Sequence, residues 1–273
     1  MNDNVNILRS EDGRYFYTGL KEGDVSKNIL LPGDVGRSKT ISELFDQADY
    51  IGLNKTCSTY NGTKGDTPIS VMSTGMGGMC ISVAMEELKM LGVKNAIRVG
   101  TGAGVQTDIP PGTLVIATGA VRGEGTSMEY APVEYPAAAD YQVVNALIEA
   151  CKEFNEEPVV GLYRAHDSFY METKCAHEGL LERMQPWIDA NVKLIENETS
   201  ILCILGKLFG IRTGTICVNL GPMCDKPARE DDEMSKIYPA LLDEKYFAQR
   251  IELCAKIAIR AMQKLNTLED EKE

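Results

Sequence analysis

The sequence predicts an α/β fold, a single domain with a central mixed, twisted β-sheet flanked by helices. Apolar runs typical of strands alternate with helical patterns from Asn28 to the end of the chain. Several of these runs stop at glycine clusters, as strands do where they turn into helices. No Pro/Ser-rich linker or block of charge divides the 273 residues, so we expect one domain over residues 1–273.

The predicted strands are short apolar runs, most of them followed by turn residues. They are Asn28–Leu31, Ile69–Ser73, Ala96–Thr101, Thr113–Val121, Val159–Ala165, Val192–Glu196 and Thr213–Leu220. The first ends at Pro32-Gly33-Asp34, the second at the turn Gly75–Gly78, and the third at Gly102-Ala103-Gly104. Because ligands of such sheets collect at the carboxyl ends of strands, we expect these turns to carry the site.

The predicted helices have apolar residues that recur every three or four positions. They are Gly36–Ala48, Cys80–Leu91, about Asp140–Phe154, Thr199–Phe209 and Tyr238–Leu265. The last is long and amphipathic, so we expect it to cover one side of the sheet. The charged tail Glu269–Glu273 is expected to fray.

Composition and charge exclude several classes of protein. A hydrophobic content of 44% rules out disorder as the dominant state. The excess of 40 acidic over 28 basic residues gives a net charge of -12, which repels nucleic acids and anionic membranes. The first thirty residues contain no long apolar stretch and the eight cysteines form no C-x-x-C pair, so we expect a cytoplasmic protein with reduced core thiols.

The glycine turns fit no nucleotide motif. Gly75, Gly77 and Gly78 miss G-x-G-x-x-G because residue 80 is Cys, and the glycines from Gly100 miss it because residue 105 is Val. No G-x-x-x-x-G-K-[ST] occurs either. These patterns argue against NAD and nucleoside triphosphates, and each glycine turn by itself is more often structural than functional.

Arginine 98 is a sharper signal, because alternation within its strand places it on the same face as Ala96 and Gly100. A guanidinium in that setting needs an anionic partner, and the commoner partner is a carboxylate in a structural ion pair. Arg37, however, follows the Pro-Gly-Asp turn within four residues of Gly33. Two arginines at two glycine-bearing strand ends indicate one oxyanion pocket.

Glu198 stands where a strand passes into a helix, so it either complements the helix dipole or holds hydroxyl groups in the same crevice. His166 and His177 are the only histidines, and with the cysteine and acidic residues around them they meet no standard ligand spacing. No metal site is expected.

Taken together in order, these segments resemble the nucleoside phosphorylase family, which includes uridine phosphorylase and the hexameric purine nucleoside phosphorylases. The resemblance covers roughly Gly19 to Leu265 and is strongest to the uridine phosphorylase branch. It rests on Leu31-Pro32-Gly33-Asp34 with Arg37, on Ser73–Gly78, on Glu86-Glu87-Leu88, on Ile97–Thr101, on Ala131–Ala137 and on Asp167-Ser168-Phe169-Tyr170.

The resemblance implies a site in three parts. The phosphate-binding residues would be Gly33, Arg37, Lys55, Arg98 and Thr101. The ribose-binding residues would be Tyr17, Thr101, Asn197 and Glu198, and the base-binding residues Gly102, Phe169, Thr173, Cys175 and Leu220. Arg98 and Glu198 would be the catalytic pair, and Lys55 and Tyr17 would act from a neighbouring subunit.

Several positions depart from the family pattern. Lys55 stands where the family usually has arginine, Tyr17 where it has histidine, and Asn197 where it has methionine. Thr173 and Cys175 replace the Gln-x-Arg pair that reads uracil, and Leu220 replaces a supporting arginine; the aspartate of the purine branch is absent too. These departures leave open which base is released and whether the sugar is ribose or deoxyribose.

The expected activity is reversible phosphorolysis of a nucleoside, uridine or a related pyrimidine nucleoside, to a free base and a pentose 1-phosphate. The alternatives are a purine nucleoside phosphorylase, a nucleosidase and a catalytically silent nucleoside-binding homologue. A pentosyltransferase of nucleoside salvage would need inorganic phosphate as co-substrate and neither a metal nor an organic cofactor. The resemblance also implies a homo-oligomer, a dimer or a hexamer built from dimers, without nucleic acid or membrane partners.

Overall fold

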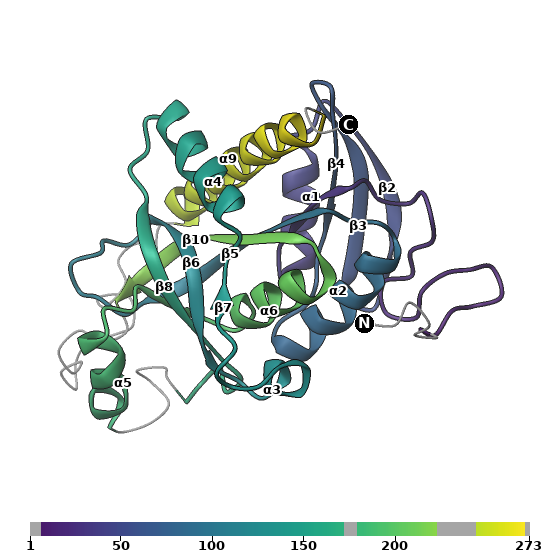
Figure 1. Ribbon diagram of the computed structural model, residues 1–273. Coiled ribbons are helices and arrows are strands. Elements are labelled where there is room, and N and C mark those ends of the chain that lie inside the picture. The colour runs from purple at the N-terminus through teal and green to yellow at the C-terminus, as the bar shows by residue number, and fades with distance from the viewer. Residues whose placement is uncertain (1–6, 172–178, 223–243, 271–273) are drawn as a thin grey trace.

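The computed structural model describes residues 7–171, 179–222 and 244–270, and its centre is a ten-stranded sheet with helices on both faces (Figure 1). The strands are β1 (Asn28–Leu31), β2 (Gln47–Asn54), β3 (Cys57–Lys64), β4 (Thr67–Met72), β5 (Asn95–Gly104), β6 (Leu114–Gly123), β7 (Ala137–Ala138), β8 (Val159–His166), β9 (Leu194–Glu196) and β10 (Arg212–Pro222). The helices are α1 (Val35–Ser42), α2 (Gly78–Met90), α3 (Thr126–Tyr130), α4 (Tyr141–Glu153), α5 (Leu180–Asp189), α6 (Thr199–Phe209) and α9 (Glu244–Asp270). The predicted mixed α/β sheet flanked by helices is confirmed.

Strand β5 organises the sheet because it has three neighbours. It pairs in parallel with β10 along one edge and with β1 along the other, where the last pair joins Leu31 to Arg98. Antiparallel β9 pairs with β5 only from Ala103 onward. Between these two partners, residues 99–102 pair with β10 on one edge and with neither β1 nor β9 on the other. A gap in the ladder therefore opens directly beside Arg98.

The sheet has two parts that meet at β5. From β1 it continues as an open sheet through β4, β3 and β2. In the other direction β5, β9, β8, β6 and β10 pair in sequence and return to β5, which closes a ring of five strands. The gap beside Arg98 thus lies where the open sheet changes into the ring.

Two layers of helix bury the two faces of the sheet. Helices α4 and α9 lie together over one face, and α2, α6 and α3 gather on the other (Figure 1). Leu30, Ile97 and Val99 belong to the buried cluster that includes α9, whereas the alternate residues Leu31 and Ala96 belong to the cluster of α2 and α6. Successive side chains of a strand point to opposite faces, so Arg98 points toward α2 and α6.

Several elements differ from the sequence-based expectation. The helix predicted over Gly36–Ala48 ends at Ser42, and β2 follows as half of a hairpin with β3 that was not predicted. Strand β2 is mostly exposed and therefore lacks the apolar stripe from which strands are recognised. Helix α5 was missed as well.

The glycine cluster after Thr101 was predicted as a turn and proves to be strand interior. β5 runs through it to Gly104. A Cβ on Gly102 would lie 2.2 Å from Cδ2 of Leu194 and 2.6 Å from the carbonyl oxygen of Ile195, so glycine lets β9 approach. The last predicted helix is α9; its expected start at Tyr238 lies outside the described residues, and the described part runs to Asp270.

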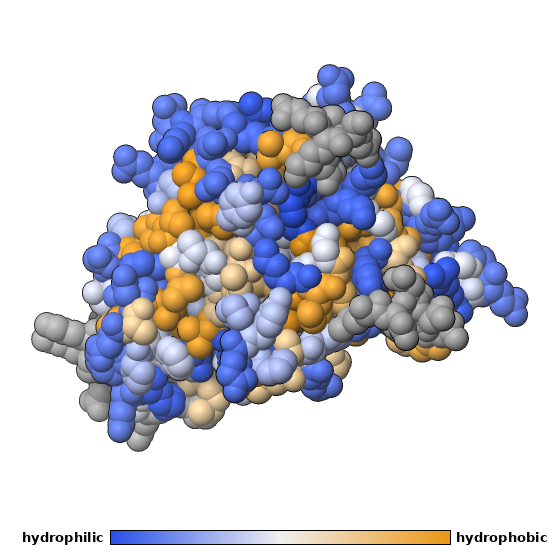
Figure 2. All heavy atoms as spheres, viewed as in Figure 1, coloured by the Kyte–Doolittle hydropathy of each residue, from blue (hydrophilic) through white to orange (hydrophobic). Residues whose placement is uncertain are grey.

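The surface and the thiols agree with a compact core. On the face seen in Figure 2, apolar residues emerge in separate groups among hydrophilic ones. The described helices include none that is both long enough and apolar enough to cross a membrane. Among the described residues, buried thiols that form no disulfide are found at Cys57, Cys151, Cys203, Cys217 and Cys254.

Replacing Gly102 with alanine is expected to lower the free energy of unfolding by about 1–3 kcal/mol, because the new methyl group would force β9 away from β5. Urea unfolding followed by circular dichroism would measure the change. Gly125→Ala is the matched control, since its φ is -84° and the nearest atom to an added Cβ is 3.8 Å away. Equal stability of the two variants would show that the two strands tolerate a wider separation.

Candidate active site

A cavity of about 510 Å³ opens beside the gap in the ladder of β5. Its walls come from the ends of β1, β4, β5, β8, β9 and β10 and from the turns that follow them. Nine of the residues singled out in the sequence line it, namely Gly33, Arg37, Arg98, Thr101, Gly102, Phe169, Asn197, Glu198 and Leu220. Residues from distant parts of the chain thus meet at one place, at the strand ends where such folds bind ligands.

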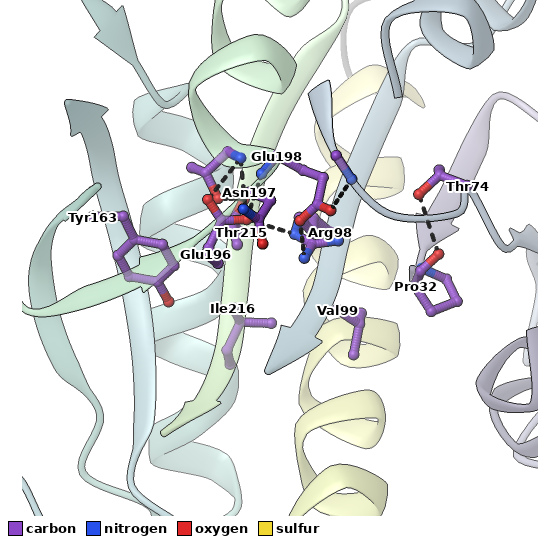
Figure 3. A network of polar contacts seen from close by, with 12 residues as sticks. Pro32, Thr74, Arg98, Val99, Tyr163, Glu196, Asn197, Glu198, Thr215 and Ile216 are labelled. Atoms are coloured by element: carbon purple, nitrogen blue, oxygen red, sulfur yellow. Dashed lines mark hydrogen bonds and ion pairs between the residues drawn. The ribbon is translucent and has the colours of Figure 1, made fainter. Parts of the chain in front are cut away.

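Arg98 is a deeply buried charge in the cavity wall, with 6% of its side chain exposed. Its Nε donates to Oε2 of Glu196 at 2.9 Å, and its Nη2 forms an ion pair with Glu198 (Figure 3). Its Nη1 is buried and has no hydrogen-bond partner within the described part of the chain. The Cβ position of Gly33 lies 3.7 Å from this Nη1. Because buried donors are almost always satisfied, an unpartnered guanidinium nitrogen at a cavity is suited to bind an anion.

Gly100 makes room for the guanidinium of Arg98. A Cβ at this position would lie 2.8 Å from Sγ of Cys217 and 3.2 Å from Nη2 of Arg98. Any larger residue would therefore push either the arginine or strand β10. The glycine of the Arg-Val-Gly segment is explained by this close approach.

Arg37 faces the same cavity from the first turn of α1. Asp34 caps this helix, since its Oδ1 accepts from the backbone N–H of Arg37 at 2.8 Å. No described carboxylate forms an ion pair with Arg37, and its Nη1 reaches only the carbonyl oxygen of Val99 at 3.5 Å. Burial, followed by repulsion from Arg98, lowers the pKa of Arg37 below its ordinary value. Two guanidinium groups that repel each other across a cavity form a site for a small oxyanion.

Glu198 is held by both of its oxygen atoms. Its Oε1 accepts from the backbone N–H of Gly77 at 2.6 Å, and its Oε2 pairs with Arg98. Gly77 has a φ of +89°, which favours glycine and brings its N–H to the carboxylate. The carboxylate therefore has a defined orientation at the cavity wall, where its remaining lone pairs can accept from ligand hydroxyl groups.

Glu196 is a second buried carboxylate in contact with Arg98, and the sequence analysis assigned it no role. It accepts from the backbone N–H groups of Glu198 at 3.0 Å and of Thr199 at 2.9 Å, so it caps helix α6. Burial raises its pKa to about 7, with Arg98 opposing the rise and Glu198 adding to it. For Arg98, burial lowers the pKa, but Glu198 and Glu196 together raise it above its ordinary value.

Aromatic and apolar residues also line the cavity. Phe169 is 55% exposed and stacks edge-to-face on Tyr170 with ring centroids 5.2 Å apart. Leu220 and Ile195 add apolar surface. The side-chain Nδ2 of Asn197 donates to the carbonyl oxygen of His166. Thr173 and Cys175, which were expected to bind the base, lie outside the described residues.

Lys55 and Tyr17 do not line the cavity of their own chain. Lys55 lies in the exposed turn between β2 and β3, with a φ of 51° and its Nζ 4.1 Å from the centre of the Phe16 ring. The hydroxyl of Tyr17 donates to the carbonyl oxygen of Thr74 at 2.9 Å and lies 2.9 Å from Oγ1 of Thr56. The hydrogen bonds of Tyr17 are thus made within its own chain.

The cavity also contains residues to which the sequence analysis assigned no individual role. Asp34, Gly75, Met76 and Ala103 belong to the three turns that were expected to carry the site, and the others are Val35, Thr56, His166, Ile195 and Glu196. Glu196 carried a signal that was available, because it lies two positions before Glu198 near the end of a strand. His166 was set aside as an ordinary histidine. The described residues contain no group of three or more His, Cys, Asp or Glu arranged to hold a metal ion.

Comparison with known proteins gives consistent matches over most of the chain. A family model described as the phosphorylase superfamily matches residues 27–260. The chain is 41% identical over 221 residues to the uridine phosphorylase of Treponema pallidum, a match that covers 80% of this chain and 85% of the relative. It is 36% identical over 218 residues to the guanosine phosphorylase of Halorubrum lacusprofundi, with 79% and 88% covered. Among solved structures, uridine phosphorylase from Vibrio fischeri ES114 superposes with a TM-score of 0.81 at 27% identity and covers 93% of this chain and 99% of that one.

The burial of Glu196 predicts a pH dependence of stability. Its pKa is about 7 in the folded chain, above the 4.5 of an ordinary glutamate, so the folded state binds the proton more tightly. The resulting stabilisation is complete below pH 4.5 and is lost as the pH rises through 7, an effect of about 3 kcal/mol. Chemical unfolding of the wild type and of Glu196→Gln between pH 4.5 and 8.5 should therefore show the wild type losing stability relative to the variant. If the free energies of unfolding of the two proteins varied with pH in parallel, the raised pKa of Glu196 would be contradicted.

Proposed function

This chain belongs to the phosphorylase superfamily, and on that premise we propose that it catalyses the reversible phosphorolysis of uridine or a related pyrimidine nucleoside. The products are the free base and a pentose 1-phosphate, so the enzyme is a pentosyltransferase. Uridine phosphorylases are found among its relatives in Treponema pallidum and Thermococcus kodakarensis, the latter at 38% identity. The observation that carries the proposal is the unpartnered Nη1 of Arg98, which shares a cavity with Arg37.

In this proposal the phosphate dianion binds between the two guanidinium groups. Arg98 and Arg37 supply the charge, and Gly33 and Thr101 line the same cavity. One phosphate oxygen attacks the anomeric carbon, the N-glycosidic bond breaks, and its electron pair leaves with the base. The sugar passes through an oxocarbenium-like state, which the nearby dianion stabilises.

The proposed role of Glu198 is to orient the sugar. Its carboxylate is fixed by Gly77 and Arg98, so it can accept from ribose hydroxyl groups without first being reoriented. Asn197 lies beside it at the cavity, and because its Nδ2 is used by His166, its Oδ1 is the atom available to a hydroxyl donor. We assign both residues to the ribose end.

The base end is proposed to take a planar pyrimidine against Phe169 and Leu220. Apolar walls recognise a ring by stacking rather than by hydrogen bonds, so a second candidate substrate is a purine nucleoside. The guanosine phosphorylase among the relatives, at 36% identity, favours including it.

We also propose a cytoplasmic, single-domain protein that works as a homo-oligomer, as dimers that join into a hexamer. It would use inorganic phosphate as co-substrate and no metal or organic cofactor. The exposed position of Lys55, away from its own cavity, supports a role in the site of a neighbouring subunit.

A phosphate-dependent screen tests the proposed reaction. Uridine, thymidine, inosine and adenosine are each incubated with and without phosphate, and the free base and sugar 1-phosphate are measured. Uridine should be cleaved only when phosphate is present. Free ribose released without phosphate would indicate a nucleosidase, and thermal stabilisation by nucleoside without any product would indicate a silent binding protein.

Arg98→Ala should lower kcat/KM for phosphorolysis by at least about 10²-fold, because the dianion loses its buried partner. Arg98→Lys should also remain strongly impaired. The guanidinium fork of arginine can pair with two carboxylates and still bind an anion, and lysine has no such fork. Arg260→Ala is the control, an arginine that pairs with Glu153 on the surface and should stay within about twofold of the wild type. Near-normal turnover by Arg98→Ala would refute the assignment.

Lys55→Ala should raise the KM for phosphate by about 10-fold or more. Its effect on the free energy of unfolding should be small, because the side chain is exposed. If Lys55 acts across a subunit contact, mixing Lys55→Ala with Arg98→Ala chains under conditions of subunit exchange should restore activity above that of either variant. Such mixed oligomers contain sites with both wild-type residues. Failure of every mixture to recover activity would place Lys55 outside the site.

A further inference from the structure

The Arg98 network contains more negative than positive charge. One guanidinium pairs with Glu196 and Glu198, whose side chains are 2% and 3% exposed. All three residues line the cavity that holds the unpartnered Nη1 (Figure 3). When both carboxylates are ionised the group carries a net charge of -1, and a dianion that binds Arg98 must approach both of them. Arg37 alone offsets only part of this repulsion.

We propose that Glu196 is a positioning residue of the anion site that takes up one proton from solvent when a dianion binds to Arg98. The proton adds to a carboxylate oxygen of Glu196 and no other bond changes. The inference rests on the proposed function for the identity of the natural dianion, phosphate, while the charge argument applies to any tetrahedral dianion of that size.

The hydrogen bonds indicate which carboxylate takes the proton. Both oxygens of Glu198 are used, by Gly77 and by Arg98, and its remaining lone pairs face the proposed ribose. In Glu196, Oε2 accepts from Arg98 and from the N–H of Glu198, whereas Oε1 accepts only from the N–H of Thr199, among the described residues.

Glu196 can therefore be protonated at Oε1 without releasing Arg98. The N–H of Thr199 also lies 3.1 Å from Oε2, so the cap of α6 survives the change. The Nε of Arg98 stays 2.9 Å from Oε2, and this contact fixes the plane of the guanidinium. Glu196 thus positions Arg98 in both protonation states.

Among the titratable and charged groups that surround it, Glu196 is the one suited to titrate near neutrality. Burial raises its pKa to about 7 before any anion arrives. On α6, Cys203 has its pKa raised by burial to about 12, as has Cys217 on β10, and burial raises that of Tyr163 on β8 well above its ordinary value. Arg98 and Arg37 keep their charge throughout. His166 also lines the cavity, so its contribution has to be measured separately.

Sulfate is the probe, because it remains a dianion across the neutral range while phosphate itself titrates there. Its affinity for the wild-type protein is measured by isothermal titration calorimetry from pH 6 to pH 9. We expect the dissociation constant to be constant below about pH 7 and to rise about tenfold per pH unit above it, as uptake of one proton requires. Repeating the titration at pH 8 in two buffers of different ionisation enthalpy should show uptake of about one proton per sulfate.

Glu196→Gln should bind sulfate with an affinity that no longer varies between pH 7 and pH 9, because the amide cannot ionise. Its amide oxygen still accepts from Arg98, so its affinity at pH 6 should remain within about threefold of the wild type. Glu124→Gln is the matched control: Glu124 is 2% exposed and accepts from Ser127 and Ser200 outside the cavity, so the variant should keep the pH dependence. His166→Gln should keep it too.

Three results would overturn the inference: a flat profile in the wild type, a persistent slope in Glu196→Gln, or loss of the slope in His166→Gln. If a variant does not fold, the two-buffer measurement on the wild type still tests proton uptake, and the absence of uptake at pH 8 would also overturn the inference. The phosphorolysis screen separates this outcome from the proposed function. A flat sulfate profile in an active enzyme leaves the function in place, whereas proton-linked sulfate binding without any phosphorolysis leaves the anion site and refutes the reaction.

Discussion

The buried guanidinium of Arg98 is the interaction on which the rest of the site depends. Two of its nitrogens are used by Glu196 and Glu198, and the third has no partner within the described chain. A charge with 6% exposure is stable only when it is paired, so the two carboxylates explain how the arginine can be buried at all. The unpartnered nitrogen is the group that we propose to hold the anion. In that proposal one side chain links the stability of the wall to the binding of the ligand.

The geometry around this arginine follows from the change of partner along β5. Where β1 ends and β9 has not begun, one edge of residues 99–102 faces the cavity instead of another strand. Glycines make that change possible, since Gly100 admits the guanidinium and Gly102 admits β9. The helix α6 begins at the same point, and Glu196 both caps it and holds the arginine. Fold and site therefore share the same few contacts.

Much of this arrangement could be predicted from local signals. The apolar runs gave β1 and the helix Thr199–Phe209 with their observed bounds, because each is apolar and has a clear turn or cap beside it. The meeting of Arg37 and Arg98 at one cavity could be expected because each arginine lies close to a glycine turn at the end of a predicted strand. The hairpin of β2 and β3 was missed because its exposure leaves no periodic apolar pattern. Glu196 was missed because the sequence placed it simply as the last residue of a predicted strand, and its contacts with Arg98 and with the start of α6 arise only in the folded chain.

The sequence by itself determined the class of fold, the family resemblance and the residue types at the strand ends, since these depend on local pattern and spacing. Only the tertiary structure decided that β1, β5, β9 and the turn after β4 converge on one cavity, that two carboxylates share one arginine, and that Lys55 and Tyr17 lie outside it. The reason is physical. Burial, pairing and the pKa of a group depend on neighbours that are distant in the chain, as Arg98 and Glu196 are, and no local pattern encodes which of those neighbours will meet.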